Sequence, residues 1–126
     1  MKIGIENLIE LTVLEKDTAK AYGSGDLNVF ATPAMIAAME NAALELVKPF
    51  LEIGEGTVGT LVNVKHIRPT PLGGRVNTVA RLIEIDGKKL TFEVEAYDFN
   101  GLIGSGTHKR FIINEVEFMN SINSTL

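Results

Sequence analysis

The chain has 126 residues, of which 45% are hydrophobic and 22% are charged, so one domain with its own core is expected. Twelve basic and sixteen acidic residues give a net charge of −4, which excludes the basic surface that nucleic acids require, and no apolar run is long enough to span a membrane. The absence of cysteine excludes disulfides and thiolate metal sites, and two histidines do not favour a metal centre. Acidic residues interrupt the N-terminal apolar stretch, so no signal peptide is predicted and a cytoplasmic location is expected.

Glycine and proline separate short periodic segments along the whole chain, without an internal repeat or a linker. We therefore predict a single domain over residues 1–126, with a core at about 8–114 and a C-terminal tail at 115–126. The first strand is predicted at residues 8–16, where apolar and polar residues mix. The segment 17–28, rich in glycine and aspartate, is predicted to be a loop long enough to form an entrance wall.

One long helix is predicted at residues 33–47. Thr32 stands where an N-cap belongs, Pro33 suits the first helical position, and Pro49 supplies a stop. Apolar residues recur at helical spacing, namely Ile36, Met39, Ala43, Leu46 and Val47. Five alanines make the first three turns thin, so a sheet could wrap closely around this helix.

Four strands are predicted after the helix, at residues 58–67, 75–86, 89–98 and 102–113. Asp86-Gly87 and Asn100-Gly101 are typical of tight hairpins, which indicates an antiparallel meander. A short helix is predicted at 116–119, followed by a frayed end at 121–126. The fold class is therefore α+β, an antiparallel sheet wrapped around one long helix. Because one helix cannot protect the whole sheet, we expect a homodimer, with a homotetramer as a further possibility.

Three polar residues stand where a purely structural design would not need them: Thr32 at the helix start, Glu40 among apolar helix neighbours, and His66 at the end of an apolar strand face. A hydroxyl, a carboxylate and an imidazole together can activate water or form an acyl intermediate, and the helix N-terminus would stabilise an oxyanion. Each residue also has a structural interpretation. Thr32 could simply cap the helix, Glu40 could be solvated, and His66 could be a satisfied strand histidine. For His108, which lies between Thr107 and Lys109, a structural role is predicted.

Residues 29–51 read VFATPAMIAAMENAALELVKPFL, residues 56–98 read GTVGTLVNVKHIRPTPLGGRVNTVARLIEIDGKKLTFEVEAYD, and residues 101–114 read GLIGSGTHKRFIIN. These stretches resemble the hotdog-fold thioesterases of the fluoroacetyl-CoA thioesterase type. The resemblance implies a hotdog fold and a catalytic set of Thr32, Glu40 and His66. It also implies that the Gly59 amide approaches the thioester and that Arg110 matches the arginine of the family's last strand.

The function expected from this resemblance is hydrolysis of a small or medium acyl-CoA to the free acid and CoA, with no cofactor because CoA is part of the substrate. Phe30 and Arg68 are expected to join Gly59 and Arg110 in substrate binding. A non-catalytic acyl-CoA binding or sensing module is the alternative. Tyr22 and Phe30 are the only aromatic residues of the segment AYGSGDLNVF, so no selectivity for a fluorinated acyl group is predicted.

Overall fold

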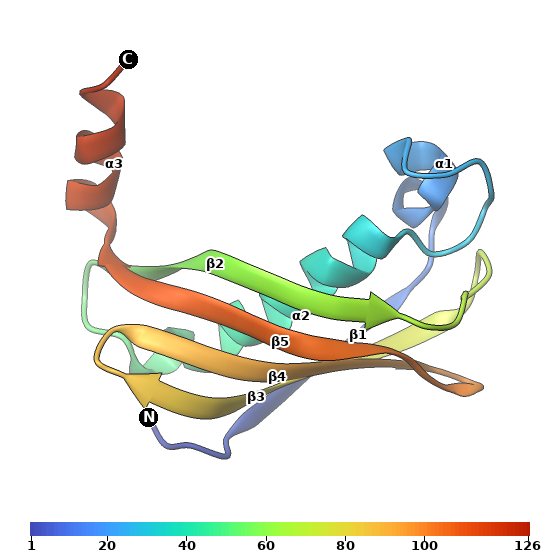
Figure 1. Cartoon of the computed structure of the whole chain (residues 1–126), viewed down its shortest axis with the longest axis horizontal. Coiled ribbons are helices and arrows are strands. Elements are labelled where there is room, and N and C mark those ends of the chain that lie inside the picture. Colours follow the sequence, from blue (N-terminus) through green and yellow to red (C-terminus); the bar gives the residue numbers. More distant parts are fainter.

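The computed structural model describes residues 1–126 and contains one five-stranded antiparallel sheet with one long helix, as predicted (Figure 1). The strands are β1 (Glu6–Thr12), β2 (Glu55–His66), β3 (Arg75–Asp86), β4 (Lys89–Asp98) and β5 (Gly101–Asn114). The helices are α1 (Ala19–Tyr22), α2 (Thr32–Val47) and α3 (Glu115–Asn123), with short 3-10 turns at Glu15–Asp17 and Lys48–Phe50. None of the helices combines the length and the apolar character needed to cross a membrane.

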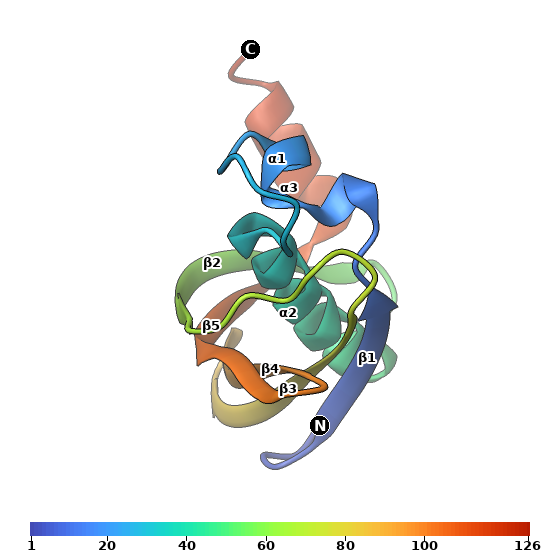
Figure 2. The same cartoon turned by 90° about the vertical axis from the view of Figure 1, so that its right-hand side faces the viewer.

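The helix α2 lies in the concave side of the curled sheet (Figure 2). Its buried face carries four alanines, two methionines, a leucine and a valine: Ala34, Met35, Ala38, Met39, Ala42, Ala43, Leu46 and Val47. The alanines let the helix backbone approach the sheet, while the fully buried Met35 and Met39 fill the remaining space. This packing accounts for the alanine-rich pattern of the sequence.

The sheet order is β1-β3-β4-β5-β2, so only β3, β4 and β5 form a meander. The predicted meander of four strands is therefore wrong: β2 pairs with β5, and β1 pairs with the other side of β3. Two glycines of β5 permit the close approach of β2. A Cβ at Gly104 would lie 2.9 Å from the carbonyl oxygen of Lys65, and Gly106 faces the backbone of β2 even more tightly. Because β2 is the last strand in this order, it is an edge strand with one unpaired side.

The bounds predicted for β3 and β4 are confirmed, and Gly87 and Gly101 make the expected tight turns with positive φ. The strand β1 lies earlier than predicted and ends at Thr12, before a 3-10 turn. The segment 17–28 contains α1, a four-residue helix that was not predicted, whose backbone is capped by the Thr18 hydroxyl.

The C-terminal helix α3 is longer than predicted because the Asn114 side chain caps its first turn by accepting from the Glu117 amide. This helix projects from the end of β5 away from the body of the molecule (Figure 1). Its apolar residues Val116, Met119 and Ile122 are exposed at a spacing of three.

The helix α2 begins at Thr32, one residue earlier than predicted, and Ala31 occupies the N-cap position without a side-chain hydrogen bond. The prediction of Thr32 as the N-cap is therefore wrong. Thr32 is the first helical residue, so its hydroxyl is free to interact outside the helix.

Candidate active site

The Thr32 hydroxyl pairs with the imidazole of His66, with 2.9 Å between Oγ1 and Nδ1. The first residue of α2 thus meets the last residue of β2, which brings together two of the three residues of the expected catalytic set. The buried ring of Phe30 lies edge-on to the imidazole, with 6.4 Å between the ring centroids. Both neighbours restrict the orientation of His66.

Burial lowers the pKa of His66 below its ordinary value of 6.5, and a backbone contact with Arg68 opposes this shift more weakly. The imidazole is therefore neutral at neutral pH and able to accept a proton. Its Nε2 atom is buried and has no hydrogen-bond partner in the chain. Buried polar atoms without a hydrogen-bond partner are rare, and the other such atom in the chain is the hydroxyl oxygen of Thr78. Since His66 also lines a pocket, its free Nε2 is a candidate for contact with a ligand.

An open pocket of about 310 Å³ lies beside this pair. It is lined by Ala19, Ser24, Val29, Phe30, Thr32, His66, Ile67, Arg68 and Pro69. The segment before α2 therefore forms one wall, in agreement with the entrance wall predicted at 17–28. Arg68 is held at this pocket by a hydrogen bond of 2.7 Å from Nη1 to the carbonyl oxygen of Asn100.

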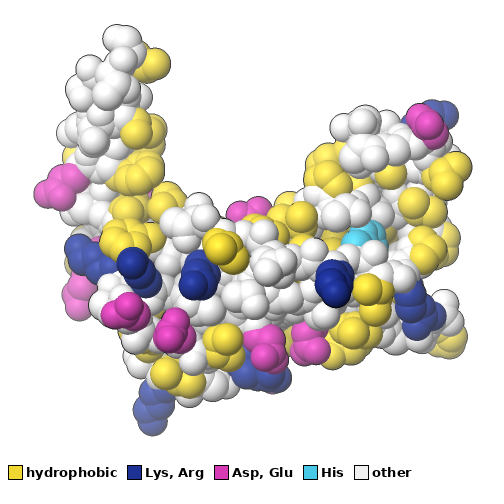
Figure 3. Space-filling view, viewed as in Figure 1, with side chains coloured by type: hydrophobic (Ala, Val, Ile, Leu, Met, Phe, Trp, Pro, Cys, Tyr) yellow, Lys and Arg dark blue, Asp and Glu magenta, His cyan; other side chains and the backbone are white.

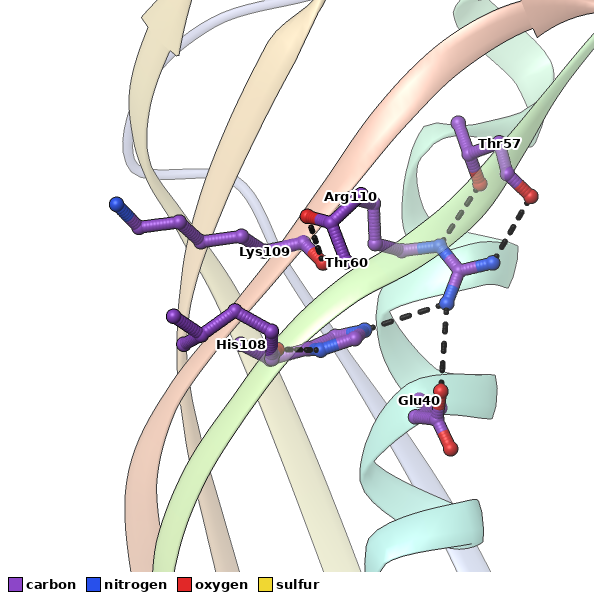
Figure 4. A network of polar contacts seen from close by, with 7 residues as sticks. Glu40, Thr57, Thr60, His108, Lys109 and Arg110 are labelled. Carbon is purple, nitrogen blue, oxygen red and sulfur yellow. Dashed lines mark hydrogen bonds and ion pairs between the residues drawn. The ribbon is translucent and has the colours of Figure 1, made fainter.

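Glu40 lies in a second polar cluster, formed by α2, β2 and β5 (Figure 4). A Cβ at Gly59 would lie 2.9 Å from Glu40 Oε2, so the carboxylate occupies the space that a side chain would fill. The guanidinium Nη1 of Arg110 lies 4.0 Å from the same oxygen. The Glu40 side chain is 40% exposed, whereas that of Arg110 is 8% exposed. The carboxylate thus lies between a buried cation and the surface.

Arg110 is fixed mainly by Thr57 of β2. Its Nε donates to Thr57 Oγ1 over 2.8 Å, and its Nη2 donates to the Thr57 carbonyl oxygen over 3.0 Å (Figure 4). Burial lowers the pKa of Arg110, and the charge of Glu40 opposes that shift. An arginine nevertheless keeps its proton at neutral pH, so a fixed positive charge faces Glu40.

The three expected catalytic residues occupy two clusters within one chain. Thr32 contacts His66, whereas Glu40 faces Arg110 and Gly59. Eight residues along α2 separate Thr32 from Glu40, a rise of about 12 Å. Gly59 and His66 are seven residues apart on β2, or about 23 Å. The clusters are therefore distinct parts of the same helix and strand.

The sequence analysis missed Thr57 and the polar role of His108. His108 is 1% exposed and lies 3.2 Å from Arg110 Nη1 through its Nε2 atom. A signal was present, because His108 and Arg110 are two residues apart on one strand and therefore share a face. No group of three or more His, Asp or Glu side chains lies close enough together to hold a metal ion.

Comparison with known proteins shows the family to which the chain belongs. A family model described as fluoroacetyl-CoA-specific thioesterase matches residues 13–116. The fluoroacetyl-CoA thioesterase of Streptantibioticus cattleyicolor is 42% identical over 90 residues, which are 71% of this chain and 65% of that protein. The match thus spans just under two thirds of the length of this curated relative.

Solved structures agree with this result. A structure of the fluoroacetyl-CoA thioesterase FlK superposes with a TM-score of 0.94 at 32% identity, covering 100% of this chain and 98% of that chain. A variant of FlK has been solved with fluoroacetate and CoA, at a TM-score of 0.89 and 34% identity over 94% of this chain and 99% of that one. A hot-dog-like protein from Thermanaerovibrio acidaminovorans matches with a TM-score of 0.92 at 19% identity, over 100% of this chain and 93% of that chain. This likeness shows that the two proteins share the hotdog fold.

Proposed function

Since the chain belongs to the fluoroacetyl-CoA-specific thioesterase family, we propose that it hydrolyses acyl-CoA thioesters to the free acid and CoA. The observation that carries this proposal is the Thr32–His66 pair beside an open pocket, with a neutral imidazole whose Nε2 has no partner. In the reaction an oxygen–carbon bond forms at the thioester carbonyl, the carbon–sulfur bond breaks, and sulfur leaves with a proton. The Thr32 hydroxyl and the Gly59 amide would donate hydrogen bonds to the carbonyl oxygen. His66 and Glu40 would provide or activate the attacking oxygen and transfer its proton.

A second copy of the chain would bring the two clusters together. The sheet has two edge strands, β1 and β2, and it is β2 that carries Gly59 and His66. Val62 and Asn63 lie midway between them, so an antiparallel pairing of two β2 strands about this point would set His66 of one copy opposite Gly59 of the other. The molecule is hollowed above β2, between α1 and α3, and a histidine ring reaches the surface there (Figures 1 and 3). The exposed Leu61 and Val62 support burial of this edge by another chain.

Mixing two inactive variants tests this composite site. His66→Ala and Glu40→Gln should each lower kcat/KM of the homodimer by a factor of about 100 or more. Subunit exchange between them should restore roughly one quarter of the wild-type activity, because half of the dimers are mixed and each mixed dimer holds one intact site. A site contained in one chain would give no restoration. If Glu40→Gln is fully active, Glu40 has no part in the reaction. Binding of acyl-CoA by the wild type without turnover would overturn hydrolysis as the function and favour a non-catalytic binding module.

The role of Glu40 divides into two mechanisms that one experiment separates. Glu40 could attack the carbonyl and form an anhydride, or it could act with His66 to activate water. A single turnover in ¹⁸O-labelled water detects direct attack when water opens the anhydride at the Glu40 carbonyl: the released acid is then unlabelled, and ¹⁸O appears in the Glu40 carboxylate. Activation of water places the label in the acid in that first turnover.

The pocket favours a small or medium acyl chain, because the segment before α2 offers few large apolar groups and the volume is about 310 Å³. Without further aromatic residues in that segment, no preference for a fluorinated acyl group is expected. The CoA phosphates would meet Lys65 and Arg68, whereas Arg75 is engaged by Glu10 and Arg110 is buried. A value of kcat/KM that rises steadily from acetyl-CoA to palmitoyl-CoA would contradict the small pocket. The cytoplasmic location and the independence from a cofactor stay predictions.

A further inference from the structure

His108 is a second histidine of the fold, and both of its ring nitrogens are engaged. Nδ1 lies 2.8 Å from the carbonyl oxygen of Leu61, and Nε2 lies 3.2 Å from Nη1 of Arg110. The ring stacks on Phe92, with 6.0 Å between centroids and 27° between planes. Figure 4 shows the imidazole, the guanidinium and the Glu40 carboxylate in sequence between β5 and α2.

These two contacts select one protonation state. A carbonyl oxygen only accepts, so Nδ1 carries the proton, and a guanidinium only donates, so Nε2 carries none. The neutral Nδ1–H tautomer is thus the one form that satisfies both neighbours. Burial is the largest influence on the pKa of His108 and lowers it, and the positive charge of Arg110 lowers it further. The hydrogen bond to the Leu61 backbone and the charge of Glu40 raise this pKa, each by less than burial lowers it. Arg110 and Glu40 are the charged groups that face this ring.

The contacts of Arg110 explain what such an acceptor does. Thr57 binds the guanidinium through Nε and Nη2. Nη1 is the one nitrogen that faces Glu40, and its other neighbour is His108. Without an acceptor at His108, one side of Nη1 is left buried and unpaired, and the guanidinium tilts to find another partner. Such a tilt moves the positive charge relative to the carboxylate beneath Gly59.

The geometry points to His108 as a positioning residue that, acting through Arg110, holds Glu40 in the place required for thioester hydrolysis. This inference rests on the proposed function, since it takes Glu40 to be part of the reaction centre. His108 itself is 1% exposed and does not line the pocket beside His66. It supplies a fixed hydrogen-bond acceptor to the buried guanidinium of Arg110. An exposed arginine would donate the same hydrogen bond to water.

Two amide variants of His108 separate positioning from packing. In His108→Gln the side-chain oxygen can reach the place of Nε2 and accept from Arg110. In His108→Asn the amide nitrogen can reach the place of Nδ1 and donate to Leu61, but nothing reaches Arg110. We expect His108→Gln to keep kcat within about threefold of the wild type and His108→Asn to lower kcat by about 10- to 30-fold, with KM changed less. Unfolding in urea records the stability of both.

A double-mutant cycle distinguishes the possible failures. In a Glu40→Gln background, His108→Asn should have no further effect on kcat, because both changes act on one group. Equal kcat values for the Gln and Asn variants, or an unchanged effect in the Glu40→Gln background, would overturn the role of His108 while leaving thioester hydrolysis intact. Full activity of Glu40→Gln would overturn the premise that Glu40 belongs to the reaction centre, and with it the role of His108, whereas absence of acyl-CoA hydrolysis by the wild type would overturn the proposed function. The ¹⁵N chemical shifts of the ring should show the Nδ1–H tautomer, and the other tautomer would also contradict the inference.

Discussion

Replacing Gly59 with alanine should separate activity from stability. The added Cβ would lie 2.9 Å from Glu40 Oε2 and 3.3 Å from His108 Cε1, so the carboxylate must move by several tenths of an ångström or more. The φ of Gly59 is not positive, so alanine is compatible with the backbone there. A misplacement approaching 1 Å costs about 100-fold in rate, or about 2.7 kcal/mol of transition-state stabilisation. We therefore expect Gly59→Ala to lower kcat/KM with acetyl-CoA by about 100-fold.

The free energy of unfolding should change by less than about 1 kcal/mol, because the displaced atom is the end of a flexible side chain and alanine restricts the unfolded chain. Gly56→Ala is the matched control: on the same strand, its Cβ would meet the Glu115 carboxylate at 3.0 Å, away from the candidate site. Activity is measured from the release of free CoA thiol, and stability from urea unfolding. If Gly59→Ala and Gly56→Ala have equal activity, the position of the Glu40 carboxylate does not matter to the reaction.

Two further predictions follow from the contacts of the histidines and of Thr32. Because Ala31 and not Thr32 is the N-cap, Thr32→Val should change the free energy of unfolding by less than about 0.5 kcal/mol. It should lower kcat at least 10-fold, whereas Thr32→Ser, which retains the hydroxyl, should keep most of the activity. Equal kcat values for the two variants would refute a role for the hydroxyl. Folding lowers the pKa values of His66 and His108, so the unfolded chain binds more protons below about pH 6.5, and stability should fall as the pH is lowered through that value. Urea unfolding from pH 7.5 to 5 should show a smaller decline for His108→Gln than for the wild type, and identical slopes would contradict this origin.

Much of the fold could be predicted because its elements are marked by local signals. The turns at Gly87 and Gly101 and the apolar spacing of α2 depend on residues close together in sequence, and their elements appear where expected. The pairing of β2 with β5 could not be predicted in the same way. It depends on Gly104 and Gly106, whose missing side chains matter only after the strands have met. Local patterns carry no information about which of two vacant sheet edges a strand will occupy.

In the candidate site, too, features marked by local sequence could be predicted and contacts between distant residues could not. The spacing of polar residues on apolar faces was enough to single out Thr32, Glu40 and His66, but it did not show that one chain divides them between two clusters. The predicted N-cap was wrong because a threonine before a proline suits either the cap or the first turn, and the partner that decides between them, His66, lies 34 residues away in the chain. The structural role predicted for His108 agrees with its burial, but its contact with the Leu61 carbonyl oxygen could not be predicted, because Leu61 lies 47 residues away in the chain.

The position of β2 at the edge of the sheet has a consequence for how the protein folds. The strands β3, β4 and β5 are joined by tight turns and can pair early, whereas β2 pairs with residues 38 to 59 positions away in sequence, from His66 with Gly104 to Glu55 with Asn114. Pairing that closes so long a loop is slow, so β2 is expected to join the sheet late. Since β2 carries His66, Gly59 and Thr57, a refolding chain would gain most of its sheet before it gains the site. Recovery of thioesterase activity should therefore lag behind recovery of secondary structure.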